Sequence, residues 1–330
     1  MRLHIQNPTD DPVFSITREQ WNAAVRRNPL AGPFEVTISD DPDRLGAELA
    51  GADILLTWVS IVARQLTAVP LRTLAPRLKI IACTSAGVDR LAPFDWLPAD
   101  VALLNNSGTH GEKAGEFGIM ALLMLQNRMP ELIRSQQAGE WRQAHGSTLR
   151  GRTLCVVGMG SLGGGVARQA RAFGMHVLGV RNGSGKHPDC DETFQADGLK
   201  GALARADDVL LACPLTAQTR NLLSRDRIGL LRKGARAVNI ARGPVWDQEA
   251  VCDALEAGHL ESAFTDVTVP EPLDPAHRLW RTRGMIVTPH VSADDREKYN
   301  DHTLDIFLRN VIAFQEGAAM PNRVDPARGY

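Results

Sequence analysis

The sequence predicts an α/β protein with two doubly wound domains, each built on a parallel sheet. The chain has 330 residues, which is enough for two domains of ordinary size. Short apolar runs alternate with helical patterns from end to end, which is typical of parallel strands joined by helical crossovers. In the second half, an apolar run leads into three glycines spaced G-x-G-x-x-G and then into a helical pattern. This order of features favours a nucleotide-binding domain there.

The first part of the chain is expected to contain five strands with helices between them. The strand candidates are 1–5, 34–39, 52–60, 78–85 and 101–106. A helical pattern occupies 17–28, between the first two candidates. A much longer helical pattern covers 112–141, and Pro130 within it is expected to kink or break the helix.

The second part is expected to contain six strands, the number found in a complete doubly wound nucleotide-binding domain. The candidates are 153–158, 176–182, 207–214, 235–242, 262–267 and 284–291. The glycine cluster at 158–165 is interpreted as a loop feature. A last helical pattern covers 301–317.

Charge and hydropathy exclude several classes of partner. Lys and Arg total 37 and Asp and Glu total 38, so a formal net charge of -1 predicts neither nucleic acid nor an anionic membrane as the main partner. The longest apolar stretch, 118–125, is too short to span a bilayer. The first residues lack the apolar core of a signal peptide, so secretion is not expected.

The cysteines indicate a reduced, cytoplasmic protein. There are five, an odd number without a C-x-x-C motif, and three of them stand in apolar runs. They are expected to be buried thiols and not a disulfide framework. His187 and Cys190 are spaced H-x-x-C, but no second ligand pair follows, so no metal site is expected.

The glycine loop is the first candidate site. Gly158 would permit a tight turn, Gly160 would let backbone amides approach a pyrophosphate, and Gly163 would allow close packing of helix on strand. Ser161 and Leu162, which open the following helix, belong to the same predicted cofactor site, because a helix N-terminus offers unpaired N–H groups to phosphates. The alternative is a glycine-rich turn without a ligand.

Arg181 stands at the end of the next strand, where such units usually offer an acidic residue to the cofactor ribose. A guanidinium there would pair with a 2′-phosphate, and Asn182 adds a further hydrogen-bond donor. The sequence therefore predicts NADP(H) as the preferred cofactor, with NAD(H) as the second choice. The alternative is that Arg181 is a solvated loop residue and either cofactor binds.

Four ionisable residues near the ends of late strands suggest hydride transfer to or from a 2-oxo or 2-hydroxy acid. Arg242 would pair with the substrate carboxylate and polarise the ketone, and His290 would act as acid or base. Glu271 would accept a hydrogen bond from the other ring nitrogen of His290, and Asp266 would face the nicotinamide carboxamide. Taken singly, each could instead be an ordinary salt-bridge, turn or capping residue.

Across nearly its whole length, the chain resembles the D-isomer-specific 2-hydroxyacid dehydrogenase family. The matching segments, in the order of the family, are "GMGSLG", "CPLTAQT", "VNIARG", "DVTVPEPL" and "TPH". The resemblance implies that Arg242, Glu271 and His290 are the catalytic set. It also implies that Cys213, Pro214, Thr219 and Ala241 contact the cofactor.

The segment "TSAGVDRL" resembles the loop that binds the substrate carboxylate in this family, which assigns that role to the backbone amides of Ala86 and Gly87. Trp58 would border the substrate, with a core aromatic residue as the alternative. Trp58, Arg181 and the tail "VDPARGY" are similar to the NADPH-preferring glyoxylate/hydroxypyruvate reductases. Glyoxylate or hydroxypyruvate is therefore the expected substrate, and a bulkier 2-oxo acid is an alternative.

The resemblance also implies the domain arrangement and a homodimer. A Rossmann cofactor domain, 106–291, would be inserted into a flavodoxin-like substrate domain made of 1–105 and 292–330. The segment near 112–141 resembles the dimer-forming region of the family.

Other members of the wider family supply rival interpretations. They are a non-catalytic NAD(H)-sensing protein of the corepressor type and an oxidoreductase acting on phosphite. Glu271 argues against a third, formate dehydrogenase-like enzymes, which carry Gln at this position. The chain departs from the family pattern in the extra glycines at 163–165, in Thr268, where an aromatic residue is common, and in the charged pair Glu112 and Lys113.

Overall fold

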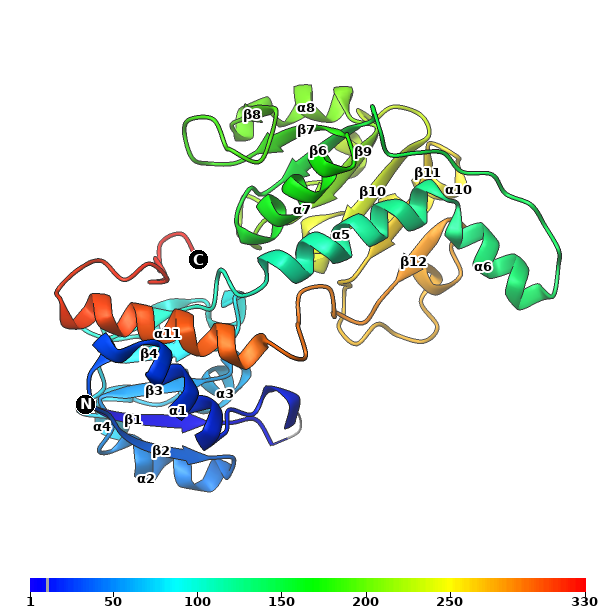
Figure 1. The fold of residues 1–330 in the computed structure, drawn as a ribbon. Coiled ribbons are helices and arrows are strands. Elements are labelled where there is room, and N and C mark those ends of the chain that lie inside the picture. The colour runs from blue at the N-terminus through cyan, green and yellow to red at the C-terminus, as the bar shows by residue number, and fades with distance from the viewer. Residues whose placement is uncertain (10–11) are drawn as a thin grey trace. The chain divides into compact units, whose positions relative to one another are not determined.

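The computed structural model describes residues 1–9 and 12–330. This part of the chain forms two compact units, residues 1–109 with 295–330 and residues 110–294. The predicted domain boundaries, after residues 105 and 291, lie a few residues before the boundaries between these units, after residues 109 and 294. Both units are α/β structures with fully parallel sheets, which confirms the predicted fold class (Figure 1).

The first unit contains the five predicted strands in one sheet. They are β1 (Arg2–Gln6), β2 (Glu35–Ser39), β3 (Ile54–Thr57), β4 (Ile80–Cys83) and β5 (Ala102–Leu104). Their spatial order, β2-β1-β3-β4-β5, is that of flavodoxin-like sheets. The helices are α1 (Arg18–Arg27), α2 (Leu45–Leu49), α3 (Val59–Gln65), α4 (Leu71–Leu74) and α11 (Tyr299–Gln315).

Local signals explain where α1 begins and why α11 belongs to this unit. Thr17 and Gln20 form a reciprocal capping box, so the helix expected at 17–28 begins at Arg18, directly after its N-cap Thr17. The last helix, α11, buries Leu304, Phe307 and Leu308 in the same core as strand β1. The C-terminal segment therefore completes a core that the N-terminal strands begin.

The second unit has seven strands, so the prediction of six is wrong by one. They are β6 (Thr153–Val157), β7 (His176–Val180), β8 (Glu192–Phe194), β9 (Asp208–Leu211), β10 (Ala235–Asn239), β11 (Leu260–Thr265) and β12 (Met285–Val287). Their order is β12-β11-β10-β9-β6-β7-β8. The missed strand, β8, has three half-buried residues at the sheet edge, too few to form a recognisable apolar run.

The helices of the second unit are α5 (Gly111–Gln126), α6 (Met129–Ala138), α7 (Ser161–Ala172), α8 (Leu199–Arg205), α9 (Arg225–Ile228) and α10 (Gln248–Glu256). The expected break in the long helical pattern is confirmed. Arg128 adopts a left-handed conformation with φ 56° between α5 and α6, and Pro130 lies in the first turn of α6, where a proline is tolerated.

The helix expected after the glycine loop begins at Ser161, so Gly163, Gly164 and Gly165 lie inside α7 and only the first part of the cluster at 158–165 is a loop. Two of these glycines are required by close packing. A β-carbon on Gly163 would collide with the Gly158 carbonyl, and one on Gly165 would collide with the Gly111 carbonyl of α5. Gly165 therefore lets α5 and α7 pack almost backbone to backbone (Figure 1).

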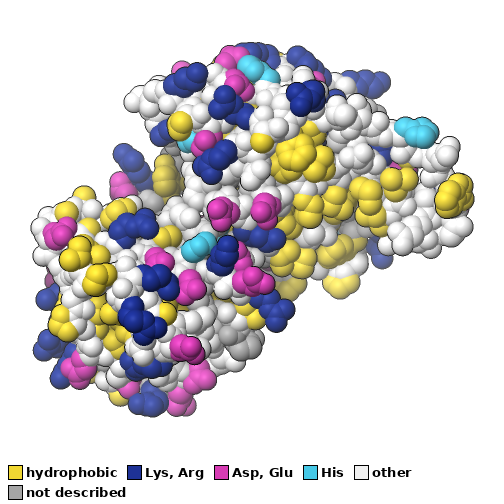
Figure 2. Space-filling view, viewed as in Figure 1, with side chains coloured by type: hydrophobic (Ala, Val, Ile, Leu, Met, Phe, Trp, Pro, Cys, Tyr) yellow, Lys and Arg dark blue, Asp and Glu magenta, His cyan; other side chains and the backbone are white. Residues whose placement is uncertain are grey.

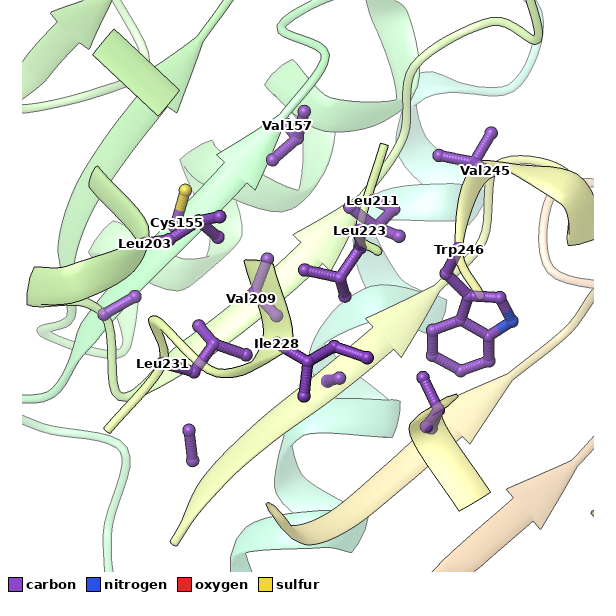
Figure 3. Close-up of a cluster of buried hydrophobic side chains, with 14 of the residues drawn as sticks. Cys155, Val157, Leu203, Val209, Leu211, Leu223, Ile228, Leu231, Val245 and Trp246 are labelled. Carbon is purple, nitrogen blue, oxygen red and sulfur yellow. The ribbon is translucent and has the colours of Figure 1, made fainter. Parts of the chain in front are cut away.

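Apolar side chains from strands and helices fill the interior of the second unit, as the cluster around Cys155, Val209 and Trp246 illustrates (Figure 3). All five cysteines are buried and unpaired, as predicted. On the face shown in Figure 2, basic and acidic side chains are interspersed. In the described part of the chain, no helix combines the length and the hydropathy that a membrane span requires.

Candidate active site

The glycine loop has the shape needed to hold a phosphate. Gly158 has φ 97°, and a β-carbon there would lie 2.6 Å from the Cys213 backbone. Gly160 precedes α7 and faces open space, since no atom lies within 4 Å of where its β-carbon would stand. Ser161 Oγ is buried without a hydrogen-bond partner in the described structure. An open cradle with unpaired donors at a helix N-terminus fits a dinucleotide pyrophosphate.

Arg181 follows β7 directly, and its main-chain N–H donates to the Phe194 carbonyl of β8. Its guanidinium lies over Gly183, where a β-carbon would collide with it. Asn182 is exposed beside it. Within residues 1–9 and 12–330, no carboxylate lies at ion-pair distance from this guanidinium. The position therefore offers a cation to a ligand.

The segment after β9 forms a tight turn held by one hydroxyl. Thr219 Oγ1 donates to the Pro214 carbonyl over 2.6 Å and accepts the Thr216 N–H over 2.8 Å. Cys213 is buried at the start of this turn, and burial raises the pKa of its thiol to about 11, so it stays protonated at neutral pH. The part of Cys213 in this site is therefore structural, because its backbone packs against Gly158 of the glycine loop.

Arg242 is presented by a turn at the carboxyl end of β10. The buried Asn239 holds that turn, because its side chain accepts the Ala241 N–H and donates to the Arg242 carbonyl. The next residue, Gly243, packs so closely on the Thr268 carbonyl that a β-carbon would not fit. The turns that carry Arg242 and Thr268 are thus fixed against each other.

Glu271 and His290 form a hydrogen-bonded pair. His290 Nδ1 lies 3.0 Å from Glu271 Oε2, and Glu271 Oε1 accepts the Thr268 N–H over 3.1 Å. Burial alone would raise the pKa of Glu271, but the hydrogen bond and charge of His290, with smaller contributions from Thr268 and Arg242, lower it. Glu271 is therefore ionised at neutral pH, and this leaves His290 Nε2 as the ring nitrogen available to a ligand.

Asp266 holds the segment that carries His290. Its carboxylate accepts the Thr288 hydroxyl and the N–H groups of Val291 and Ser292, at 2.7–2.9 Å. Its main-chain carbonyl accepts the His290 N–H over 2.8 Å. His290 adopts φ 57°, a conformation that is uncommon for residues other than glycine. Asp266, which the sequence predicts to contact the cofactor, thus holds the backbone on both sides of His290.

Two residues that the sequence interpretation missed also shape the site. Gln248, in the first turn of α10, accepts the Val269 N–H and donates to the Val269 carbonyl, both over 3.1 Å. It thus holds the loop that ends in Glu271. His110, before α5, contacts the segment after His290. A helix-favouring glutamine and an isolated histidine carry no sequence pattern that would have revealed either contact.

The predicted substrate residues Trp58, Ala86 and Gly87 lie in the first unit, after β3 and β4. Trp58 packs against Phe14 and Tyr299, with ring centroids 5.1 and 6.0 Å away. The backbone bends at 84–86 after β4, and Gly87 follows this bend. Among the described residues, no acceptor lies within hydrogen-bond distance of the Ala86 and Gly87 N–H groups, which suits capture of an anion.

Comparison with known proteins places the chain among dehydrogenases. The model of the family "D-isomer specific 2-hydroxyacid dehydrogenase, NAD binding domain" matches residues 119–292, more than half of the chain. Glyoxylate reductase of Korarchaeum cryptofilum is 30% identical over 76% of this chain and 77% of its own. Glyoxylate reductase/hydroxypyruvate reductase of Mus musculus is 30% identical over 75% of this chain and 77% of its own.

Solved structures agree over nearly the full length. A D-isomer specific 2-hydroxyacid dehydrogenase from Xanthobacter autotrophicus, crystallised with NADPH and MES, superposes with a TM-score of 0.81 at 27% identity, covering 100% of this chain and 99% of that one. An NADPH-dependent glyoxylate/hydroxypyruvate reductase from Sinorhizobium meliloti, crystallised with NADP and sulfate, gives 0.80 at 26% identity with the same coverage.

Proposed function

This chain belongs to the D-isomer specific 2-hydroxyacid dehydrogenase family of NAD(P)-dependent enzymes, and we propose that it reduces glyoxylate or hydroxypyruvate with NADPH. The observation that carries the proposal is the hydrogen-bonded pair Glu271–His290. This pair, Arg242 and the glycine loop all follow strands of the same parallel sheet, so they lie at its carboxyl edge. In open α/β sheets, this carboxyl edge is where ligands bind. The relatives from Mus musculus and Sinorhizobium meliloti bear the names of these two activities.

The proposed roles follow from charge and geometry. A nicotinamide cofactor held by the glycine loop would supply the hydride that reduces the carbonyl carbon of the 2-oxo acid. His290 donates a proton from Nε2 to the carbonyl oxygen, which yields the 2-hydroxy acid and oxidised cofactor. Glu271 holds the ring through Nδ1 and places a negative charge beside it, while Arg242 polarises the carbonyl. The backbone amides of Ala86 and Gly87 take the carboxylate, and Trp58 borders the substrate.

The remaining expectations about the site become proposals on the same basis. The segments 106–291 and 1–105 with 292–330 would be the cofactor and substrate domains. Gly158, Gly160, Ser161, Leu162 and Gly163 would hold the pyrophosphate, as their open cradle suggests. Cys213, Pro214, Thr219, Ala241 and Asp266 would line the rest of the cofactor site. The unpaired, buried cysteines support a reducing compartment such as the cytoplasm.

The decisive experiment follows NADPH absorbance with a panel of 2-oxo acids. We expect turnover with glyoxylate or hydroxypyruvate, a loss of at least ~100-fold in kcat for His290→Ala, and cofactor affinity unchanged in that variant. His145→Ala, which removes an exposed histidine of the same unit, is the control. Full turnover by the His290 variant would refute the assigned proton donor. Oxidation of phosphite, or cofactor binding without turnover of any acid, would favour the corresponding rival function.

Cofactor preference is tested at Arg181. Arg181→Asp removes the proposed partner of the 2′-phosphate and introduces repulsion, so we expect the KM for NADPH to rise by about 10- to 100-fold and the KM for NADH to fall. Arg309→Asp, at an exposed position on α11, makes the same charge change as a control. Equal KM values for the two cofactors in the wild type would contradict the preference.

We also propose a homodimer formed through the α5–α6 region. Met120 on α5 is 40% exposed and Trp141, after α6, is 97% exposed. Hydrophobic side chains gather over this region in Figure 2. Light scattering should give twice the chain mass, and Trp141→Glu should shift it toward the monomer. A monomeric wild type would overturn this assignment.

A further inference from the structure

His110 is a buried histidine outside the set of residues assigned so far. It is 5% exposed and directly precedes α5, the first helix of the second unit. Its Nδ1 lies 2.9 Å from the carbonyl oxygen of Ala293. A carbonyl only accepts hydrogen bonds, so Nδ1 carries the proton and donates. The contact joins two segments that are far apart in the sequence.

Ala293 lies three residues after His290, on the segment that carries the proposed proton donor. Asp266 holds the near part of that segment through Thr288, Val291 and Ser292. His110 holds its far part. The backbone at His290 has φ 57°, and such a conformation persists only where its surroundings impose it. Both attachments therefore help to fix the position of the His290 imidazole.

The helix behind His110 provides a rigid support. At its first residue, Gly111, α5 touches α7 so closely that Gly165 tolerates no side chain, and further along Gly118 faces Val166 in the same way. His110 is thus fixed relative to the helix whose N-terminus forms the proposed phosphate cradle. The Ala293 carbonyl is held against a part of the molecule that has little freedom to shift.

Burial is the main reason that the ring of His110 stays neutral. Burial lowers its pKa most, the positive charges of Arg242 and His290 lower it further, and the Ala293 carbonyl and Asp294 act in the opposite direction. Asp294 Oδ1 is 4.0 Å from Nδ1. A neutral ring donates to Ala293 without adding a positive charge close to Arg242.

We propose that His110 is a positioning residue that acts on His290 through the Ala293 carbonyl. The proposal rests on the proposed function, because it assumes that His290 transfers the proton. It predicts that what matters at position 110 is a hydrogen-bond donor at the place of Nδ1, and not the aromatic ring or its charge.

Three substitutions separate these properties. Asparagine places its Nδ2 donor near the position of Nδ1, glutamine places its donor near that of Nε2, and alanine has neither. We expect His110→Asn to keep kcat within about threefold, and His110→Gln and His110→Ala to lose about 10- to 100-fold, since small misplacements of catalytic groups cost that much. The KM for the 2-oxo acid and the affinity for NADPH should stay within about threefold in all three.

Hydrogen–deuterium exchange supplies a readout that does not depend on turnover. Peptides covering 288–294 should exchange faster in the Gln and Ala variants and at the wild-type rate in the Asn variant. Thermal unfolding identifies any variant that is globally destabilised, and His145→Ala is again the control. Wild-type kcat in the Gln variant, or an Asn variant as slow as the Ala variant with equal stability, would overturn the proposal. A wild type that reduces no 2-oxo acid would instead refute the proposed function, while the exchange data would still decide whether His110 holds this segment.

Discussion

At the scale of single residues, the Glu271–His290 pair shows how one hydrogen bond sets two properties at once. The carboxylate orients the ring through Nδ1 and supplies a negative charge beside it. Glu271→Gln separates these effects, because the amide oxygen still accepts from Nδ1 but carries no charge. We expect kcat/KM to fall by at least ~10-fold at neutral pH, with little change in cofactor affinity. A fully active Gln variant would show that orientation alone suffices.

The pH dependence of stability gives a second test of the same pair. The folded-state pKa of Glu271 is lowered, so its stabilising effect is present above the unfolded-state pKa and is lost as the pH falls through the folded-state value. The difference in unfolding free energy between wild type and Glu271→Gln should therefore be largest near neutral pH and disappear in acid. Urea unfolding at several pH values measures it. A difference that grows as the pH falls would contradict this sign.

Arg242, Glu271 and His290 could be predicted as candidate catalytic residues from the sequence because each follows a recognisable strand. The sequence could not reveal His110 or Gln248. Their contacts reach Ala293 and Val269 across the fold, and neither position has a local pattern. For Asp266, the sequence suggested a contact with the cofactor, whereas the structure shows its carboxylate receiving three hydrogen bonds from the segment around His290.

At the scale of elements, the contact between α5 and α7 makes a sharp prediction about adjacent glycines. Gly165→Ala would drive a methyl group into the Gly111 carbonyl, so we expect a loss of about 1–3 kcal/mol in unfolding free energy. Gly164→Ala is the matched control, because its β-carbon would meet only Asp189 and His187, at 3.5 Å. Helix propensity predicts a gain of up to ~1 kcal/mol there. Similar effects at both positions, measured by chemical unfolding, would refute this packing argument.

The same scale explains where the prediction of elements failed. Strand β8 is short and half-buried, so it depends on pairing with β7 more than on its own composition. The three consecutive glycines of α7 are unusual, because glycine disfavours helices. Only the partner helix α5 reveals why the glycine at 165 is needed inside one.

At the scale of the whole molecule, the alternation of strands and helices was enough to predict two parallel α/β sheets. Strand order was not accessible from alternation, because it depends on which edges pair, and it was implied only by the resemblance to a family. That the C-terminal segment, 295–330 in the structure, belongs to the first unit was likewise implied only by this resemblance. In the structure, its physical basis is the apolar face of α11, which completes the core of that unit.

The assignment of the two units to cofactor and substrate makes a last prediction for the intact chain. NADPH at about 100 times its Kd should stabilise the protein by ~2.7 kcal/mol, because it binds only the folded state. Hydrogen–deuterium exchange should then slow in 158–163, 181–186 and 213–219, all within the second unit. A 2-oxo acid added with oxidised cofactor, a pair that cannot react, should further slow exchange in 84–88 of the first unit, around Ala86 and Gly87. Protection of 84–88 by the cofactor alone, or none with the acid, would contradict the proposed carboxylate site.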